Sequence, residues 1–176
     1  MSTSHANHVP RVHIVGRKNA GKTTLVCELV AEFQRREIPV ATVKHTHHAH
    51  ELDTPGKDSH QHRTAGAAGV GILSPGMTAA FVPTIRAQQE HNRYRPFQIM
   101  FSDCRLILVE GDLQTSAPRI EVWRSIVSEP PYAAEDPQIE RIVSDDDVSS
   151  KSQRHARSDV AGLADWILQR TATSKD

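Results

Sequence analysis

One short segment constrains the fold more than any other part of the sequence. Residues 16–23 read Gly-Arg-Lys-Asn-Ala-Gly-Lys-Thr, a full match to the pattern G-x-x-x-x-G-K-[S/T]. A strand-forming run, Arg11–Val15, precedes this segment, and apolar residues at helical spacing follow it over Thr23–Arg36. A glycine-rich turn between a strand and a helix offers backbone N–H groups and the positive end of the helix dipole to an anion. The segment therefore predicts a phosphate-binding loop, and with it nucleotide binding.

Four side chains of this loop have expected roles. Lys22 is predicted to reach the β- and γ-phosphates and to be catalytic, and the Thr23 hydroxyl is predicted to bind Mg²⁺. Arg17 and Lys18 add two cations to the loop. Both could be solvated loop charges. Alternatively, one of them could supplement phosphate binding, for example across a dimer interface.

A carboxylate at the end of a buried strand is the second feature expected of such a site. Residues 106–111 read Leu-Ile-Leu-Val-Glu-Gly, which is an apolar strand followed by an acid and a glycine. Glu110 is predicted to hold Mg²⁺ through water or to orient an attacking water. Buried strands also end in acids by chance, so the prediction depends on the phosphate loop beside it.

The rest of the chain alternates strands and helices. Further strands are expected at Val40–Val43, Arg105–Val109, Arg119–Trp123 and Ile139–Val143, helices at Ser59–Ala68 and Asp159–Arg170, and a hairpin from Val70–Leu73 and Ala79–Val82. Residues 86–96 are expected to be helix or loop. This order predicts an α/β fold of the P-loop NTPase type, a mainly parallel sheet flanked by helices in three layers.

The domain organisation follows from the same pattern. We expect a disordered N-terminal tail over residues 1–10 and a single nucleotide-binding domain over residues 11–172. Residues 145–158 are acidic and then rich in serine and arginine, so we expect a mobile segment there.

Composition excludes some classes of function. The 176 residues contain 21 Lys and Arg against 21 Asp and Glu, so a globally basic nucleic-acid binder is excluded. The chain has two cysteines, a polar start and no apolar run near the roughly 20 residues that a membrane span requires. We therefore expect a cytoplasmic protein that binds neither membranes nor nucleic acid.

A histidine-rich segment follows the second strand. Residues 44–62 hold six histidines together with Asp53 and Asp58. This density of imidazoles and carboxylates is compatible with a transition metal, although it contains no recognised zinc spacing. The alternative is a polar loop that lies against the phosphates. Asp53 and Asp58 could each offer a carboxylate to Mg²⁺ or serve as turn and cap residues.

The chain resembles the molybdopterin-guanine dinucleotide biosynthesis protein B (MobB) family. The resemblance rests on GRKNAGKTTL, VKHTHH with Asp53, TPGKDS with the downstream AGAAG, and LILVEG. It continues more weakly through PRIEVWR, IVSDD and DVAGLADWIL. One departure follows Glu110-Gly111, where the family usually has an aromatic residue and a lysine and this chain has Asp112-Leu113.

The resemblance implies a GTP-binding partner protein of molybdenum cofactor assembly. Such proteins look like homodimers with weak, Mg²⁺-dependent GTPase activity at most, and they are thought to assist the guanylyltransferase that attaches GMP to molybdopterin. By position, Lys44, His45, Asp53 and Asp58 would face the phosphate and Mg²⁺ site, and Glu110 would close it. The phosphate and Mg²⁺ site itself would comprise Gly16, Arg17, Lys18, Asn19, Ala20, Gly21, Lys22, Thr23 and Thr24.

The choice of GTP over ATP comes from the resemblance, because the N/T-K-x-D signature that reads guanine in many GTPases is absent. Asp145 follows a predicted strand, where it could accept hydrogen bonds from guanine N1 and N2 or could cap a turn. Two other functions share the phosphate loop. One is a metallochaperone GTPase that uses the histidine-rich segment, and the other is a small-molecule kinase.

Overall fold

The computed structural model describes residues 8–48, 51–83, 93–148 and 150–172. The chain forms two compact units, a larger one from residues 1–46 and 97–176 and a smaller one from residues 47–96. The larger unit holds the phosphate-loop segment, and the smaller one holds most of the histidine-rich segment.

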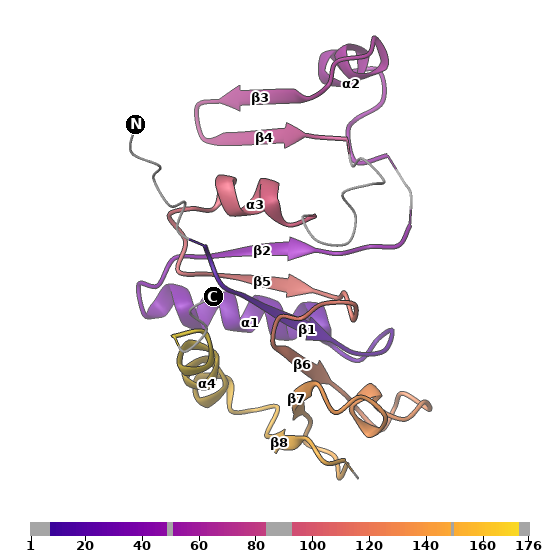
Figure 1. Ribbon diagram of the computed structural model, residues 1–176, viewed down its shortest axis with the longest axis vertical. Helices are drawn as coiled ribbons and strands as arrows, with labels where there is room; N and C mark the ends of the chain where they lie inside the picture. The colour runs from indigo at the N-terminus through magenta and orange to yellow at the C-terminus, as the bar shows by residue number, and fades with distance from the viewer. Residues whose placement is uncertain (1–7, 49–50, 84–92, 149, 173–176) are drawn as a thin grey trace. The chain divides into compact units, whose positions relative to one another are not determined.

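A six-stranded sheet is the framework of the larger unit, and all of its strand pairs are parallel. In spatial order the strands are β2 (Val40–Lys44), β5 (Leu106–Glu110), β1 (Arg11–Val15), β6 (Arg119–Val122), β7 (Ile139–Val143) and β8 (Gln153–His155). The apolar part of β5 is fully buried, as its continuous hydrophobic run predicts for a central parallel strand. The predicted α/β fold, a parallel sheet flanked by helices, is confirmed (Figure 1).

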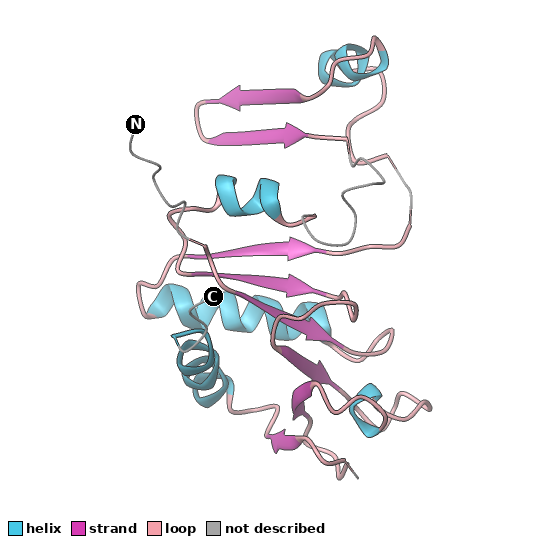
Figure 2. Ribbon diagram, in the orientation of Figure 1, coloured by secondary structure: helices cyan, strands magenta, loops and turns pink. Residues whose placement is uncertain are grey.

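Two helices cover one face of this sheet. Helix α1 (Lys22–Arg35) and helix α4 (Val160–Ala172) lie on the same side (Figure 2). They share one core cluster with Val12 and Ile14 of β1. Their fully buried side chains are Leu25, Leu29 and Phe33 from α1 and Leu163, Ala164 and Ile167 from α4. The helical spacing of these residues gives each helix an apolar face toward the strands.

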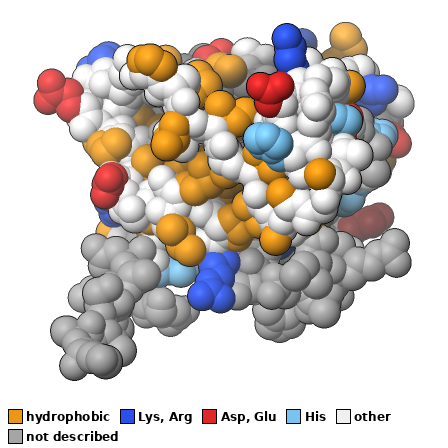
Figure 3. Space-filling view, turned by 90° about the horizontal axis from the view of Figure 1, so that it is seen from above, with side chains coloured by type: hydrophobic (Ala, Val, Ile, Leu, Met, Phe, Trp, Pro, Cys, Tyr) orange, Lys and Arg blue, Asp and Glu red, His pale blue; other side chains and the backbone are white. Residues whose placement is uncertain are grey.

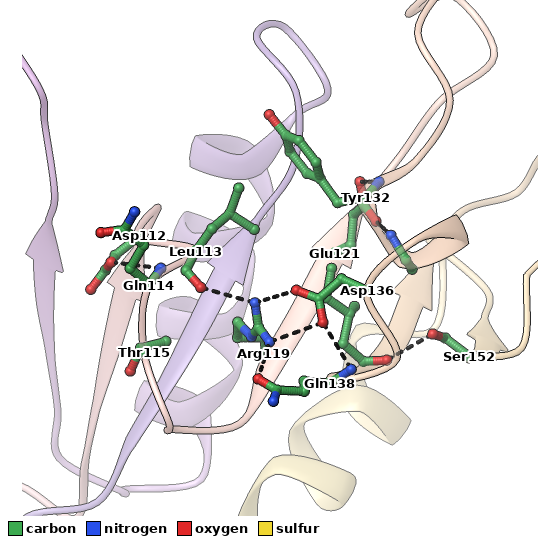
Figure 4. Close-up of polar contacts among 12 residues, drawn as sticks. Asp112, Leu113, Gln114, Thr115, Arg119, Glu121, Tyr132, Asp136, Gln138 and Ser152 are labelled. Atoms are coloured by element: carbon green, nitrogen blue, oxygen red, sulfur yellow. Dashed lines mark hydrogen bonds and ion pairs between the residues drawn. The ribbon is translucent and has the colours of Figure 1, made fainter.

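The opposite face carries a smaller core. Because side chains alternate along a strand, Val15 of β1 faces away from Ile14 and joins Ile139 and Ile142 of β7 in a second cluster. A short 3₁₀ helix, η2 (Tyr132–Ala134), packs there. The two carboxylate oxygens of the buried Glu121 accept hydrogen bonds from the backbone N–H groups of Tyr132 and Ala133 in η2, at 2.9 Å and 2.8 Å (Figure 4).

A buried arginine fastens the loops on this side. Arg119 is 3% exposed and donates to the Leu113 carbonyl oxygen at 2.9 Å (Figure 4). It also donates to both carboxylate oxygens of Asp136, at 2.6 Å and 3.2 Å, and to Gln138 Oε1 at 2.8 Å. These four bonds satisfy a guanidinium that would otherwise be costly to bury.

Several expected element bounds change in the structure. The short strand β8 lies inside residues 145–158, where a mobile connection was expected. The expected helix or loop over residues 86–96 overlaps helix α3 (Arg95–Met100), which continues four residues further. Residues 84–92 lie outside the described part of the chain. Gln98 of α3 exchanges two hydrogen bonds with the backbone of Val9, at 2.7 Å and 2.8 Å. Residues 1–7 of the expected tail also lie outside the described residues.

The smaller unit contains one helix and one hairpin. Helix α2 (Asp58–Thr64) ends earlier than predicted, two residues before Gly66, whose φ is +102°. The predicted hairpin is present as β3 (Val70–Ser74) and β4 (Met77–Phe81). Hydrophobic side chains are exposed on the face of the molecule that Figure 3 shows. Among the described helices of the whole chain, none has the length and apolar character needed to cross a bilayer.

Candidate nucleotide site

The phosphate loop connects β1 to α1 through three residues with positive φ. Gly16 has φ +142°, Asn19 has φ +63° and Gly21, the N-cap of α1, has φ +98°. A Cβ on Gly16 would overlap the carbonyl oxygen of Val122 in β6, so only glycine fits at that position. The loop backbone therefore curls tightly against the sheet and leads directly into the first turn of a 14-residue helix.

Lys22 reaches across this loop. Its Nζ donates to the Arg17 carbonyl oxygen at 2.7 Å. Burial lowers the pKa of Lys22, the nearby Lys44 lowers it further, and Glu110 acts in the opposite direction. A partly desolvated ammonium beside a second cation gains from an anion close to it. This environment suits phosphate binding.

The first helical turn after the phosphate loop and the end of β5 are joined by a side-chain hydrogen bond. Thr23 Oγ1 donates to Glu110 Oε1 at 2.8 Å, across 87 residues of sequence. The parallel register places Lys44 of β2 beside Glu110 of β5, and His45 N donates to the Glu110 carbonyl oxygen at 2.9 Å. The structure therefore brings the predicted residues Thr23, Lys44, His45 and Glu110 together at the carboxyl edge of the sheet.

This arrangement fits a magnesium ion. Mg²⁺ prefers oxygen ligands and commonly uses one or two protein groups, with water and phosphate completing its shell. A threonine hydroxyl and a half-buried carboxylate in contact at the mouth of a phosphate loop are a donor set of that kind. The residues that would hold the ion in this unit are Thr23 and Glu110.

A cavity of about 450 Å³ adjoins the other end of the phosphate loop. Asp145, the predicted base-reading residue, follows β7 and lines this cavity. The neighbouring Asp146 accepts a hydrogen bond from Ser125 N at 2.6 Å, and the Ser125 bonds hold the pKa of Asp146 below its usual value. The lining residues are Ala20, Gly21, Thr24, Arg124, Ser125, Ile126, Ser144, Asp145, Asp146 and Arg157.

Sequence reasoning missed the second wall of this cavity. Arg124 follows β6, and its Cδ lies 4.0 Å from the position that a Cβ on Gly21 would occupy. Arg157 follows β8. The one available signal was that Arg124 comes just after a strand, because residues at the carboxyl ends of parallel strands share one edge of the sheet.

The two loop cations have different surroundings. The Arg17 guanidinium stacks on the Tyr132 ring, 3.9 Å from its centroid, and donates to the Pro130 carbonyl oxygen at 3.3 Å. Lys18 is exposed. Arg17 therefore ties the phosphate loop to the segment before η2.

The two other predicted magnesium ligands belong to the smaller unit. Asp53 is 9% exposed, and its Oδ1 accepts hydrogen bonds from Thr54 N at 2.8 Å and from the Ser59 hydroxyl at 3.0 Å. Its Oδ2 is buried with no hydrogen-bond partner among the described residues. Asp58 is exposed in the first turn of α2.

The histidine-rich segment offers no converging metal ligands in the part of the chain that the structure describes. No group of three or more His, Cys, Asp or Glu side chains meets there. His60 instead lies 3.7 Å from Glu51, which also pairs with Arg63 at 2.5 Å. His50 lies outside the described residues.

Asp112, which stands where the family usually has an aromatic residue, is a buried turn residue. It is 5% exposed with φ +65°, and its Oδ1 accepts a hydrogen bond from Gln114 N at 3.1 Å. Its Oδ2 lies 3.9 Å from Nδ1 of the buried His13. The carboxylate therefore stabilises the connection after β5 and is not exposed at the site.

Comparison with known proteins identifies the family. A sequence model of the family described as "Molybdopterin guanine dinucleotide synthesis protein B" (MobB) matches residues 11–145. The chain belongs to the MobB family. This membership assigns it to molybdopterin guanine dinucleotide biosynthesis. The match includes the phosphate loop, Glu110 and Asp145, and it stops before Arg157.

Individual MobB relatives show how far the similarity extends. A Haemophilus influenzae molybdopterin-guanine dinucleotide biosynthesis adapter protein is 32% identical over 124 residues, 70% of this chain and 68% of that protein. An Escherichia coli protein of the same name is 29% identical over 162 residues, 92% of this chain and 93% of that protein. A crystal structure of molybdopterin-guanine biosynthesis protein B (mobB) has a TM-score of 0.67 at 26% identity and covers 92% of this chain and 99% of that one.

Proposed function

We propose that this MobB family member is a GTP-binding adapter that assists the guanylyltransferase that attaches GMP to molybdopterin. The observation that carries the nucleotide part is the 2.8 Å contact between Thr23 and Glu110, which joins the phosphate loop to the strand-end acid. The adapter part is supported by the names of the H. influenzae and E. coli relatives.

Each group at the site has a defined task in this proposal. The amides of residues 16–21 and the N-terminus of α1 surround the phosphates, and Lys22 neutralises their charge. Thr23 and Glu110 hold Mg²⁺ in the larger unit. In the smaller unit, Oδ2 of Asp53 has no hydrogen-bond partner among the described residues and is suited to a cation or an N–H donor. Asp53 and Asp58 remain predicted magnesium ligands.

Hydrolysis is expected to be slow. Glu110 is engaged with the Thr23 hydroxyl, so its carboxylate serves the metal first and can orient an attacking water only through that ion. A nucleotide that is held without rapid turnover suits an adapter, because the bound state then lasts long enough to engage a partner protein.

Guanine selectivity is assigned to Asp145. A carboxylate accepts hydrogen bonds from the N1–H and N2–H groups of guanine, and adenine offers no such pair of donors. Asp145→Asn replaces one acceptor with a donor, which matches xanthine, whose C2 carries a carbonyl oxygen. We expect the variant to lose GTP affinity and gain XTP affinity in calorimetric titrations with Mg²⁺. Unchanged GTP affinity would show that Asp145 does not read the base.

The adapter role is tested directly by capture. Tagged protein should retain the guanylyltransferase on a resin in the presence of Mg²⁺ and GTP. The same experiment with Lys22→Ala separates a nucleotide-dependent complex from a constitutive one. Failure to retain the enzyme under any nucleotide condition would refute the adapter proposal.

The protein is also proposed to act as a homodimer. An isolated two-stranded hairpin is marginally stable in water, and β3–β4 exposes Leu73 and Met77 at 85% and 73%. An edge strand with exposed apolar side chains favours pairing with another strand. A second copy of the chain offers an identical hairpin, which suits the self-complementary contact of a two-fold dimer.

One observation favours a second candidate function. A cavity of about 440 Å³ lies between α1 and β2 and is lined in part by Thr23, Lys44 and Glu110. A small molecule held there would lie at the metal end of the site, as an acceptor must in a P-loop kinase. Transfer of labelled γ-phosphate from GTP to an added small molecule would establish this function, and its absence across candidate acceptors would favour the adapter.

A further inference from the structure

The connection after β8 holds the loop that carries Asp145. Strands β7 and β8 pair up to Val143 and His155, and Ser144 N then donates to the His155 carbonyl oxygen at 3.0 Å. Two residues later, Arg157 N donates to Asp145 Oδ1 at 2.8 Å. The position of the Asp145 carboxylate is therefore set by a backbone segment outside the β7 loop itself.

The Arg157 side chain continues from this segment to the phosphate-loop helix. Its Nη1 donates to Glu28 Oε2 at 2.5 Å, although 129 residues separate the two in sequence. The two side chains are 20% and 41% exposed, so the pair is partly shielded from water. Glu28 lies one turn after Thr24 on α1. Both Thr24 and Arg157 line the cavity of about 450 Å³ that Asp145 also lines, which we call the base cavity.

Base selection requires a fixed carboxylate. To accept hydrogen bonds from both N1–H and N2–H, the carboxylate must lie near the plane of the guanine ring. A carboxylate that rotates freely loses part of each hydrogen bond. The backbone N–H of Arg157 donates to Oδ1 of Asp145 and so holds the carboxylate in one orientation. Each carboxylate oxygen can still accept a further hydrogen bond, from guanine.

We infer that Arg157 is a positioning residue for base selectivity, which connects Asp145 on one side to Glu28 of the phosphate-loop helix on the other. This inference rests on the proposed reading of guanine by Asp145. It assigns the discrimination between GTP and ATP partly to the Glu28–Arg157 ion pair, of which Arg157 lies beyond the residues that the family model matches.

The chain contains a matched control for an ordinary surface ion pair. Arg36 also links α1 to the C-terminal part of the chain, because it bonds to Glu32 at 2.6 Å and to Asp165 and the Ala161 carbonyl oxygen of α4. It does not line the base cavity. Loosening the contact between α1 and the C-terminal segment should therefore affect Arg36→Ala and Arg157→Ala alike, whereas loss of base positioning should affect only the second.

The experiment compares three ligands in the full chain by calorimetry with Mg²⁺: GTP, ATP and inorganic tripolyphosphate, which has no base. In Arg157→Ala and Glu28→Ala we expect the ratio of GTP to ATP affinity to fall roughly tenfold, the worth of about one hydrogen bond. Tripolyphosphate affinity should stay within about twofold of wild type, because this ligand has no base for Asp145 to read and the partly exposed ion pair makes only a small general contribution. Glu28→Ala removes a half-exposed helical side chain, so it carries the test if Arg157→Ala fails to fold.

The outcomes separate the inference from the proposed function. A wild-type GTP to ATP ratio in both Arg157→Ala and Glu28→Ala overturns the inference, and if Asp145→Asn has lost its GTP preference the base-reading proposal survives. An equal loss of selectivity in Arg36→Ala also overturns the positioning inference, because general loosening between α1 and the C-terminal segment then explains the effect. If Asp145→Asn keeps its GTP preference, both fail. Recovery of the ratio in the charge-reversed pair Glu28→Arg with Arg157→Glu supports the inference.

Discussion

At the scale of single residues, Lys22 has the most sharply defined role in the proposal. It is partly desolvated and lies near Lys44, so burial and repulsion both lower its pKa, and a phosphate would relieve the repulsion. Lys22→Ala should weaken Mg²⁺–GTP binding roughly 100-fold, the upper range for hydrogen bonds to charged groups. Calorimetry measures this, with the exposed Lys151→Ala as control. Wild-type affinity in Lys22→Ala would refute the phosphate site.

The proposal gives Glu110 a metal-binding role and a catalytic role, and one substitution separates the two. Glu110→Gln keeps an oxygen that can accept the Thr23 hydrogen bond but removes the negative charge that would orient an attacking water and accept its proton. We expect nucleotide binding to persist and phosphate release from GTP to fall roughly tenfold or more, as for loss of a general-base or water-orienting group. The exposed Glu135→Gln serves as control. Equal turnover in both variants would remove Glu110 from hydrolysis.

The predictability of these residues depends on how local their signals are. Lys22 and Thr23 belong to one contiguous pattern, and Glu110 ends a run of buried apolar residues, so each could be predicted from its neighbours in the chain. Arg157 has no such signal. Its contacts with Glu28 and Asp145 exist only after β8 pairs with β7 and α4 packs on α1.

At the scale of elements, β1 carries a buried titratable group. His13 is fully buried, and burial lowers its pKa from 6.5 to about 4, although Asp112 and the Gly111 carbonyl oxygen favour the charged form and Arg11 opposes it. Between pH 6.5 and 4 the unfolded chain therefore binds more protons at this residue than the folded chain. Stability should fall as the pH decreases through this window, by up to about 3 kcal/mol at about 1.4 kcal/mol per pKa unit.

Urea unfolding at several pH values between 7 and 4 tests this expectation. His13→Gln removes the titration and should flatten the dependence of the unfolding free energy on pH, whatever its effect at pH 7. An identical slope in the variant and the wild type would show that other groups control acid stability.

Element bounds were predictable where the hydrophobic pattern was strong. Strands β1 and β7 match the expected residues, because both are short segments rich in Val and Ile between turn signals. Strand β8 reads Gln-Arg-His and lies at the sheet edge with mostly exposed side chains, so its pairing comes from the backbone and from tertiary context. Helix α3 has no buried residue and gave no periodic signal.

At the scale of the whole molecule, the two ends of the proposed nucleotide site differ in how they are built. The phosphate end is one strand, one loop and one helix in sequence, closed by the neighbouring strand β5. The base end is assembled from the connections after β6, β7 and β8, which meet because parallel strands end at a common edge. The sequence motif therefore predicted the first end, and the topology determines the second.

The last prediction concerns assembly. If the β3–β4 hairpin is the dimer surface, a double substitution of its most exposed apolar side chains, Leu73→Lys with Met77→Lys, should place like charges across the contact and release monomers. Sedimentation should show a dimer for wild type and a monomer for the variant. Ile99→Lys, which changes an apolar residue of α3 that is 66% exposed, is the matched control and should remain dimeric. A variant that stays dimeric would place the contact elsewhere, and a monomeric wild type would refute the homodimer itself.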